Sequence, residues 1–395
     1  NQPTACVKSM AKNPKNLTDF VSGGFDGQII VWNLPEKKPL FNIKSPHNMI
    51  KGLSYTDNGN DILDVGDDNK ISIYSKPSLY EQKENFGLEK MTSILDNSPD
   101  SFPREYQPAS VYTTDGFLES IDHSYKEKIF VTGGQVVSLW NYERNTPIQI
   151  YKTSPDGYLK VKFNYSDQNI FFATGFDRTI CIFDIRTQNP TKSISLRNKS
   201  ACGCWNPQEP MNFTIGNEDS NCYTFDFRKF DKILMIHKDH INSVLDLDYS
   251  STGKEFVTGS FDQTIRIFRT TEGYSRECYH TKRMQKVYSV LYTADSRYVL
   301  SGSDDTNIRI WKATANDPIK ILTKRESEHR EYSSRLIEKY KYMPNIRKIL
   351  NHKHLPKYVI NKRNELKIRK ESKLRKFHNK ELNSKPGTLE YKPER

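Results

Sequence analysis

The sequence contains no long uncharged apolar segment and no apolar opening segment, and each absence excludes a class of protein. No window of about 18 uncharged apolar residues occurs, so neither a membrane-spanning helix nor a membrane partner is expected. The first residues, NQPTACVKSMAKNPKN, lack the apolar core of a secretory signal peptide. Cysteine is also scarce, with 6 in 395 residues, mostly in or beside strand-like runs. This usage is typical of reduced, buried thiols in an intracellular protein.

Motifs of catalysis and metal binding are absent as well. No P-loop, Gly-x-Ser-x-Gly or His-Glu-x-x-His segment occurs, and no pair of catalytic carboxylates can be picked out. Cys202 and Cys204 could ligate a metal only with two further ligands, and no second Cys or His pair stands at suitable spacing. His352 and His354 lie in a lysine-rich turn, where helix capping or RNA contact is favoured over metal binding. We therefore expect a protein that is not an enzyme, with no catalytic residues, metal ion or cofactor.

Positive charge is concentrated at one end of the chain. The net charge is +12, but residues 324–395 contain 22 Lys and Arg against 9 Glu. Residues 1–323 carry a net charge of −1, so the excess positive charge belongs entirely to the last 72 residues. Such asymmetry indicates an acidic partner for this segment, most often a nucleic acid.

One pattern recurs seven times: a small residue, a turn with Asp, and an alternating apolar strand that ends in an aromatic. The copies read GGFDGQIIVW, VGDDNKISIY, TGGQVVSLW, TGFDRTICIF, GNEDSNCYTF, GSFDQTIRIF and GSDDTNIRIW. Successive closing aromatics are 42, 66, 43, 42, 43 and 43 residues apart. A period of about 40–45 residues is typical of WD-repeat β-propellers, which have four strands per blade. The sequence therefore predicts an all-β, seven-bladed WD-repeat β-propeller over residues 1–323, with an insertion near 76–108 in the one long gap.

Six of the seven copies carry an aspartate six positions before the closing aromatic. This position falls in the tight turn between the second and third strands of a blade, where a carboxylate can accept turn N–H groups. We therefore expect these residues to be structural rather than catalytic. They are Asp26, Asp68, Asp177, Asp219, Asp262 and Asp305, and the third copy has Gly134 instead.

The sixth blade retains a second hallmark of the repeat. His240 precedes its first strand and could join Thr258 and Asp262 in most of the hydrogen-bonded chain that braces such blades. Phe268 lacks the indole N–H that would complete this chain. An outer strand is expected in each blade, for example PIKILT from Pro318 in the last one. The way in which the ring closes stays open.

The sequence changes in character after Leu322. Gly is absent until Gly387, and apolar residues recur at helical spacings of 4, 4 and 3 from Tyr332. Pro344 can begin a second, short helix, and a third, very basic stretch follows Pro356. The sequence therefore predicts a basic α-helical extension over residues 324–395.

Two interpretations of the basic stretch remain open. It could be a solvated helix of mixed charge, or it could bind RNA or preribosomal particles through phosphate contacts of little sequence preference. For the second interpretation the candidate contacts are Arg347, Lys348, Lys353, Lys357, Lys362, Arg363, Arg369, Lys370, Lys373, Arg375 and Lys376.

Several runs resemble one WD-repeat family. The segments NEDSNCYTFDFR, DHINSVLDLDYSSTGKEFVTGSFDQTIRIF, YHTKRMQKVYSVLYTADSRYVLSGSDDTNIRIWK and EYSSRLIEKYKYMPNIRKILNHKHLPK are similar to the Sof-type WD-repeat proteins. The most specific parts are YHTKRMQ and the tail segments HKHLPK and SKPG, which ordinary WD proteins lack. The resemblance implies a nuclear, nucleolar scaffold of the small-subunit processome. Its partners would be processome proteins, pre-rRNA and the U3 snoRNA particle, and it would act in processing toward 18S rRNA.

The same resemblance implies an alternative function. Members are also described as DDB- and cullin-associated factors, that is, substrate receptors of a cullin–RING ubiquitin ligase. That role uses an Asp-x-Arg ending after the third strand of a repeat. The candidate docking residues are Asp184, Arg186, Asp226 and Arg228, although both copies have Phe where the motif prefers Trp. A purely structural role for both motifs, in which the Asp ends the strand and the Arg covers the blade, is the other interpretation.

Overall fold

The computed structural model describes residues 5–75, 107–350 and 352–385. The chain divides into two compact units, residues 1–321 and 322–395. The predicted insertion near 76–108 lies almost entirely outside the described residues. Among the described helices, none is long and apolar enough to cross a membrane.

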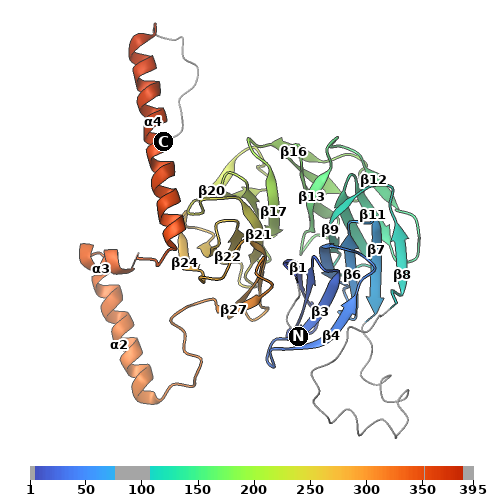
Figure 1. Ribbon diagram of the computed structural model, residues 1–395, viewed down its shortest axis with the longest axis horizontal. Coiled ribbons are helices and arrows are strands. Elements are labelled where there is room, and N and C mark those ends of the chain that lie inside the picture. The colour runs from blue at the N-terminus through green and yellow to red at the C-terminus, as the bar shows by residue number, and fades with distance from the viewer. Residues whose placement is uncertain (1–4, 76–106, 351, 386–395) are drawn as a thin grey trace. The chain divides into compact units, whose positions relative to one another are not determined.

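The first unit is a ring of seven antiparallel sheets, each of which is one blade (Figure 1). In each blade the strands lie side by side in chain order, starting from the centre of the ring. The seven-bladed propeller predicted from the repeat is therefore confirmed. By blade, the strands are β1 (Val7–Lys12), β2 (Asp19–Gly24), β3 (Gln28–Asn33), β4 (Lys38–Lys44); β5 (Ile50–Tyr55), β6 (Asp61–Gly66), β7 (Lys70–Ser75), β8 (Ser110–Thr113); β9 (Leu118–His123), β10 (Ile129–Gly134), β11 (Val137–Asn141), β12 (Gln149–Tyr151); β13 (Tyr158–Phe163), β14 (Ile170–Gly175), β15 (Thr179–Asp184), β16 (Lys192–Ser195); β17 (Ser200–Trp205), β18 (Asn212–Asn217), β19 (Cys222–Asp226), β20 (Ile233–His237); β21 (Val244–Tyr249), β22 (Glu255–Ser260), β23 (Ile265–Arg269), β24 (Ser275–Tyr279); and β25 (Val287–Tyr292), β26 (Tyr298–Ser303), β27 (Ile308–Lys312).

The hydrophobic core of the ring consists of layers between neighbouring blades. Each of seven clusters of buried apolar side chains joins two adjacent blades, because the inner strands are buried on both faces. The repeated glycine at the end of the second strand lets the next blade approach, and a Cβ on Gly302 would lie 2.7 Å from Val7 Cγ1. The cluster that joins the last blade to the first is the smallest, with only Val7, Met10, Phe20, Leu291 and Leu300 buried in it.

The last blade has three strands within the described residues, whereas the other six blades have four. The prediction of an outer strand in PIKILT is wrong, because residues 313–323 form no strand. Ile319 and Ile321 have 77% and 101% of their surface exposed, so this segment packs on nothing that would hold it in a sheet. Its backbone instead leads to Thr323, which caps the first helix of the second unit.

The described residues of the second unit form three helices, as the sequence predicts. They are α2 (Lys324–Tyr340), α3 (Pro344–Leu350) and α4 (Lys357–Asn383). A capping box fixes the start of α2, in which Glu326 N donates to Thr323 Oγ1 and the Glu326 carboxylate accepts from Thr323 N. Pro344 begins α3 and Pro356 precedes α4, where the absent proline N–H leaves no helical hydrogen bond unmade.

Candidate functional site

The six repeat aspartates lie in the turns between the second and third strands. Asp177 Oδ1 accepts a hydrogen bond from Thr179 N at 3.1 Å, and Asp219 Oδ1 accepts one from Asn221 N at 3.0 Å. In every one of these turns the residue after the aspartate has a positive φ, which residues other than glycine rarely adopt. Side-chain acceptance of a turn N–H stabilises this backbone conformation. The left-handed residues are Gly27, Asn69, Arg178, Ser220, Gln263 and Thr306.

A second repeated position, on the second strand of each blade, carries a buried polar side chain. In three blades the closing tryptophan donates its indole N–H to this side chain, for example Trp140 Nε1 to Thr132 Oγ1 at 3.0 Å. In three other blades the closing aromatic is Phe and cannot donate. The second blade alone has a carboxylate at this position, Asp64. The residues are Ser22, Asp64, Thr132, Thr174, Thr214, Thr258 and Ser301.

In the sixth blade a histidine takes the place of the missing indole. His240 Nδ1 lies 2.9 Å from Asp262 Oδ2, and His240 Nε2 lies 2.7 Å from Thr258 Oγ1. Asp262 also accepts hydrogen bonds from Ile241 N and Thr264 N. Burial opposes ionisation of Asp262, but the charge and hydrogen bond of His240 lower the pKa of its carboxyl to about 2. The hydrogen bonds from Asp262 in the turn through His240 to Thr258 on β22 therefore form a buried brace that contains an ionised carboxylate.

The second blade contains a similar brace that the sequence analysis missed. His47 Nδ1 contacts Asp68 in the turn, and His47 Nε2 lies 3.4 Å from Asp64 Oδ1 and 3.2 Å from Ser72 Oγ. Burial alone would lower the pKa of His47, but Asp64 and Asp68 raise it. The signal was present in the sequence, because His47, like His240, stands just before the first strand of its blade.

The first strands of all seven blades line a cavity of about 210 Å³ at the centre of the ring. Ion pairs between blades cross this region, and they too were missed from the sequence. Two of these ion pairs join adjacent blades, and the other two join blades that have one blade between them. The pairs are Lys51–Glu119 at 2.6 Å, Lys162–Asp122 at 2.7 Å, Lys160–Asp246 at 3.6 Å and Lys12–Asp248 at 3.2 Å.

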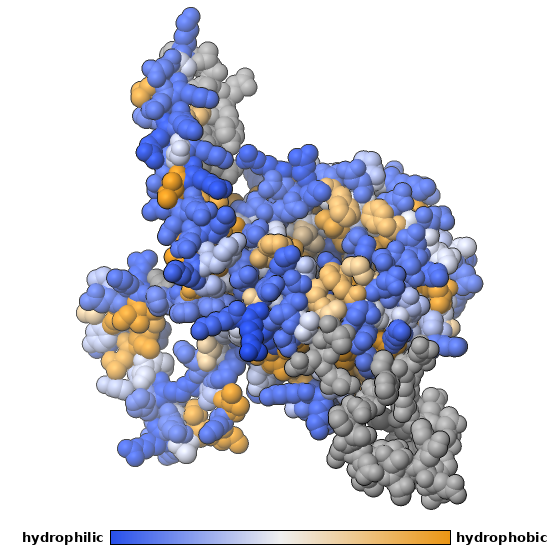
Figure 2. Space-filling view, viewed as in Figure 1, coloured by the Kyte–Doolittle hydropathy of each residue, from blue (hydrophilic) through white to orange (hydrophobic). Residues whose placement is uncertain are grey.

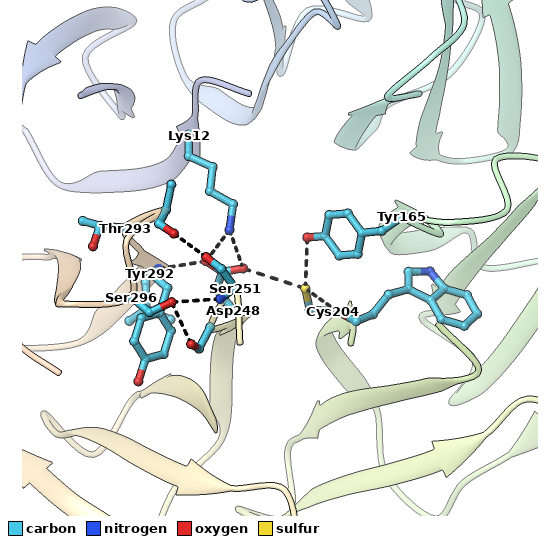
Figure 3. A network of polar contacts seen from close by, with 12 residues as sticks. Lys12, Tyr165, Cys204, Asp248, Ser251, Tyr292, Thr293 and Ser296 are labelled. Carbon is cyan, nitrogen blue, oxygen red and sulfur yellow. Dashed lines mark hydrogen bonds and ion pairs between the residues drawn. The ribbon is translucent and has the colours of Figure 1, made fainter. Parts of the chain in front are cut away.

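Figure 3 shows how one of these carboxylates, Asp248, connects its own blade with three others. Asp248 Oδ2 accepts hydrogen bonds from Tyr292 N at 2.8 Å and from Lys12 Nζ at 3.2 Å. Cys204 Sγ lies 3.8 Å from Asp248 Oδ1, and the Tyr165 hydroxyl points at the same sulfur from 3.7 Å. Because each of the four lysines that line the cavity is paired with a carboxylate of another blade, the arrangement braces the ring.

The buried thiols do not supply a nucleophile. Burial, with Asp248 adding to it, raises the pKa of Cys204 to about 11, and burial likewise raises the pKa of Cys181 to about 11. A thiol with such a pKa is protonated near neutral pH and is unreactive. Among the described His, Cys, Asp and Glu side chains, no group of three or more is placed to hold a metal ion.

The two Asp-x-Arg motifs lie at the ends of β15 and β19, in the turns toward the outer strands. Arg228 folds back on its own motif, with Nε 3.2 Å from Asp226 Oδ1 and Nη2 3.1 Å from Asp226 Oδ2. Two-thirds of the Arg228 side chain is nevertheless exposed. In the other motif Arg186 N donates to Asp184 Oδ1 at 3.0 Å, and the Arg186 side chain is exposed. The structure thus repeats the same turn in adjacent blades.

The candidate tail residues lie on the second unit, on α3, on α4 and between them. Nine of the eleven are exposed, and Lys353 and Lys362 are half-buried. Figure 2 shows that hydrophilic residues cover most of α4. Sequence reasoning missed Lys380, which follows Lys362, Arg369, Lys373 and Lys376 at spacings of 7, 4, 3 and 4 and so lies on the same face of α4. We call these five residues the α4 stripe.

Comparisons with known proteins cover both units. A family profile described as Sof1-like domain matches residues 313–395, and profiles of the WD domain, G-beta repeat, match residues 231–269 and 276–312. Protein SOF1 of Saccharomyces cerevisiae is 34% identical over 372 residues, which is 91% of this chain and 74% of the yeast protein. DDB1- and CUL4-associated factor 13 of Homo sapiens is 38% identical over 385 residues, which is 97% of this chain and 81% of the human protein.

The zebrafish protein of the latter name, from Danio rerio, is 36% identical over 383 residues, again 97% of this chain and 81% of the relative. Neither of these two names denotes an enzyme. The resemblance seen in the sequence is confirmed, because identity above one-third extends across both the propeller and the helical unit. The chain therefore belongs to the Sof1-like family of WD-repeat proteins.

Proposed function

We propose that this protein is a non-catalytic scaffold of the small-subunit processome, required for pre-rRNA processing toward 18S rRNA and for assembly of the small ribosomal subunit. In this proposal it works in the nucleolus, where processome proteins bind the propeller. The helical unit contacts pre-rRNA or the U3 snoRNA particle. Its membership of the Sof1-like family supports the assignment.

The observation that carries the proposal is the separation of charge between the two units. The propeller is nearly neutral, and its interior cations are paired, whereas the helical unit has a large positive excess. The α4 stripe runs from Lys362 to Lys380, about 27 Å at the helical rise of about 1.5 Å per residue. A row of cations of this length can contact several phosphates of a nucleic acid backbone at once, with little preference for sequence.

Neutralising four residues of the α4 stripe should weaken RNA binding in a salt-dependent way. In the full chain, Lys362, Arg369, Lys373 and Lys376 are replaced by Gln. If each contacts one phosphate of a single strand, the slope of log affinity against log salt should decrease by about 3, since each contact contributes about 0.7. Filter binding to 5′ pre-rRNA fragments over a salt series measures the slope. Affinity purification with RNA sequencing measures recovery of U3 snoRNA and 5′ pre-rRNA, which should fall together with the slope.

The matched control replaces Lys362, Lys373 and Lys376 by Arg, which keeps the charge and the helix. This variant should bind and purify like the wild type. Recovery of U3 snoRNA and 5′ pre-rRNA by the glutamine variant at the wild-type level would contradict the role of α4. Recovery of neither RNA by the wild type would contradict the processome assignment itself.

A second candidate function, as a substrate receptor of a cullin–RING ligase, is favoured by the two Asp-x-Arg turns. These turns expose arginines in neighbouring blades, and relatives more than one-third identical are named DDB1- and CUL4-associated factor 13. Both aspartates also hold their turns together, because each accepts the backbone N–H of its arginine. The arginine side chains can therefore be changed without removing that hydrogen bond.

Replacing Arg186 and Arg228 together by Ala should abolish capture of the ligase adaptor and leave recovery of preribosomal RNA unchanged. Each turn should survive, because Asp184 and Asp226 still accept the backbone N–H at position three of the motif. Co-purification of the adaptor and of U3 snoRNA from the same cells measures both. Adaptor capture at the wild-type level would show that these turns are not the docking site.

A further inference from the structure

The loop 280–286, between β24 and β25, is a rigid carrier of positive charge. Residues 280–294 contain three basic and no acidic residues. Met284 is buried in the layer between the last two blades, and its N–H bonds to Thr281 Oγ1 at 3.2 Å. Lys282 and Arg283 are exposed beside this anchor. The loop belongs to the YHTKRMQ segment, one of the features that distinguish the sequence from ordinary WD proteins, and neither proposed function uses it.

Aromatic rings stand next to these cations at the same end of the blades. The first and second strands of a blade are antiparallel, so the first strand begins at the end of the blade where the second strand ends. In the last blade a hydrogen bond of 3.0 Å from Asp304 N to Lys286 O joins these two points. Lys286 Nζ lies 4.6 Å from the ring centre of Phe261, which is 38% exposed in the turn of the sixth blade. Phe261 is itself fixed by a hydrogen bond from its N–H to Ser243 O at 3.0 Å.

The arrangement continues into the first blade. Lys286 and Tyr288 are two residues apart and so point to the same side of the strand, while Val287 between them is buried. Lys8 Nζ lies 5.3 Å from the ring centre of Tyr288, and the Phe25 ring centre lies 5.9 Å from it. Burial and Asp304 raise the pKa of the Cys6 thiol, while Lys8 and Lys286 oppose the increase.

Carboxylates also lie at this end, and several of them are held by other groups. Asp26 accepts Gln28 N, Asp262 lies 2.9 Å from His240 Nδ1, and Asp305 is paired with Arg309. Lys8 has the acidic neighbours Glu119 and Asp246 deeper in the ring, where Lys51 and Lys160 balance them. The loop 280–286, by contrast, contains Lys282 and Arg283 and no carboxylate.

We propose that the loop 280–286, together with Phe25, Phe261, Tyr288 and Lys8, binds single-stranded RNA. We call this surface the aromatic–cationic face. Proteins hold single strands by stacking bases on aromatic rings while cations contact the phosphates, and this face combines both groups on a rigid support. The proposal rests on the proposed function in one respect, that the RNA is a single-stranded part of the preribosomal particle.

The test uses the full chain in which Lys362, Arg369, Lys373 and Lys376 of the α4 stripe are Gln, so that the contribution of α4 to RNA affinity is reduced. Replacing Phe261 by Ala should reduce affinity for a single-stranded U-rich oligonucleotide by about tenfold, the scale of one lost stacking contact. Replacing Lys282, Arg283 and Lys286 by Ala should reduce the salt slope by about 2, at about 0.7 per contact. Fluorescence anisotropy measures both, with duplex RNA of the same length as a weaker competitor.

Matched controls lie at the opposite end of the blades. Tyr274→Ala removes an aromatic ring that is 66% exposed in the turn between β23 and β24, and Lys15, Lys38 and Lys254 changed to Ala remove three exposed lysines. Neither control should change the affinity more than about twofold.

Crosslinking of the wild-type chain to a 4-thiouridine oligonucleotide gives an independent result. Crosslinked peptides that contain Phe261 or Tyr288 would support the proposal. Crosslinks confined to α4, or an unchanged affinity in the Phe261→Ala chain, would overturn it while leaving the processome assignment intact. Crosslinks from this face to a processome protein, with none to RNA, would assign the face to protein binding and would also overturn the proposal.

Discussion

Replacing His47 by Ala is expected to lower the free energy of unfolding by about 3–5 kcal/mol, the range for a buried ion pair that loses one partner. The side chains of His47 and Asp64 are both 0% exposed. Without the imidazole, Asp64 is left as a buried carboxylate that accepts a hydrogen bond from the Ser45 hydroxyl at 2.5 Å but has lost its cationic partner. Guanidinium unfolding followed by tryptophan fluorescence measures the loss.

A second substitution should restore most of this stability. The other six blades have Ser or Thr at the position equivalent to Asp64. The double variant His47→Ala, Asp64→Thr therefore removes the unpaired buried carboxylate and puts in its place the kind of side chain that the other blades have. If the double variant is no more stable than His47→Ala alone, the loss comes from the cavity and not from the buried charge. The pH dependence is a further check. Because Asp64 and Asp68 raise the pKa of His47 against the effect of burial, its contribution is present below about pH 6.5 and is lost as pH rises through the folded pKa.

Replacing Asp262 by Ala should cost about 3–5 kcal/mol as well, because it removes a buried, charged acceptor and leaves its donors without a partner. Asp262 makes four hydrogen bonds, with His240 Nδ1, Ile241 N, Thr264 N and Thr264 Oγ1. The equivalent change in the first blade, Asp26→Ala, is the matched control. Asp26 is half-buried and accepts Gln28 N, so its loss should cost about 1 kcal/mol. Equal losses for the two variants would show that the histidine brace adds nothing.

Acid should remove the contribution of Asp262 in the wild type. Burial opposes its ionisation, but His240 holds the folded pKa at about 2, below an unfolded value of about 3.9. The stabilisation is therefore present above about pH 4 and is lost as pH falls toward 2, an effect of about 2 kcal/mol. The difference in unfolding free energy between the wild type and Asp262→Ala should be smaller at pH 3 than at pH 5. An equal difference at the two pH values would contradict the assigned pKa.

The repeat made the propeller predictable because its signals are local. A small residue, a turn aspartate and an alternating strand recur at a fixed period, and each blade needs only its own segment to be recognised. The helical unit was equally accessible, since Pro344 and Pro356 mark helix starts by removing an N–H. The prediction of a strand in PIKILT was wrong because it used only the local composition. A strand also needs neighbouring residues to pack against, and the side chains of Ile319 and Ile321 are exposed.

The bonds that hold blades to one another were not predictable, because their partners are far apart in the sequence. Lys12 and Asp248 are 236 positions apart, and nothing near either residue indicates the pairing. The left-handed turn residues illustrate the same limit at short range. Asn69 and Gly27 are usual at positive φ, but Arg178 and Thr306 adopt it only because the aspartate turn imposes it on them. The aromatic–cationic face likewise combines three blades.

The bond between Lys12 and Asp248 has a consequence for how the ring comes apart. The described chain passes covalently from each blade to the next except at the seam between β27 and β1, which has the smallest apolar layer. Asp248 lies on the sixth blade. It accepts hydrogen bonds from Tyr292 N of the last blade and from Lys12 Nζ of the first blade, which face each other across the seam. Separation of the last blade from the first therefore also requires breaking the Lys12–Asp248 ion pair, which joins the first blade to the sixth across the seam.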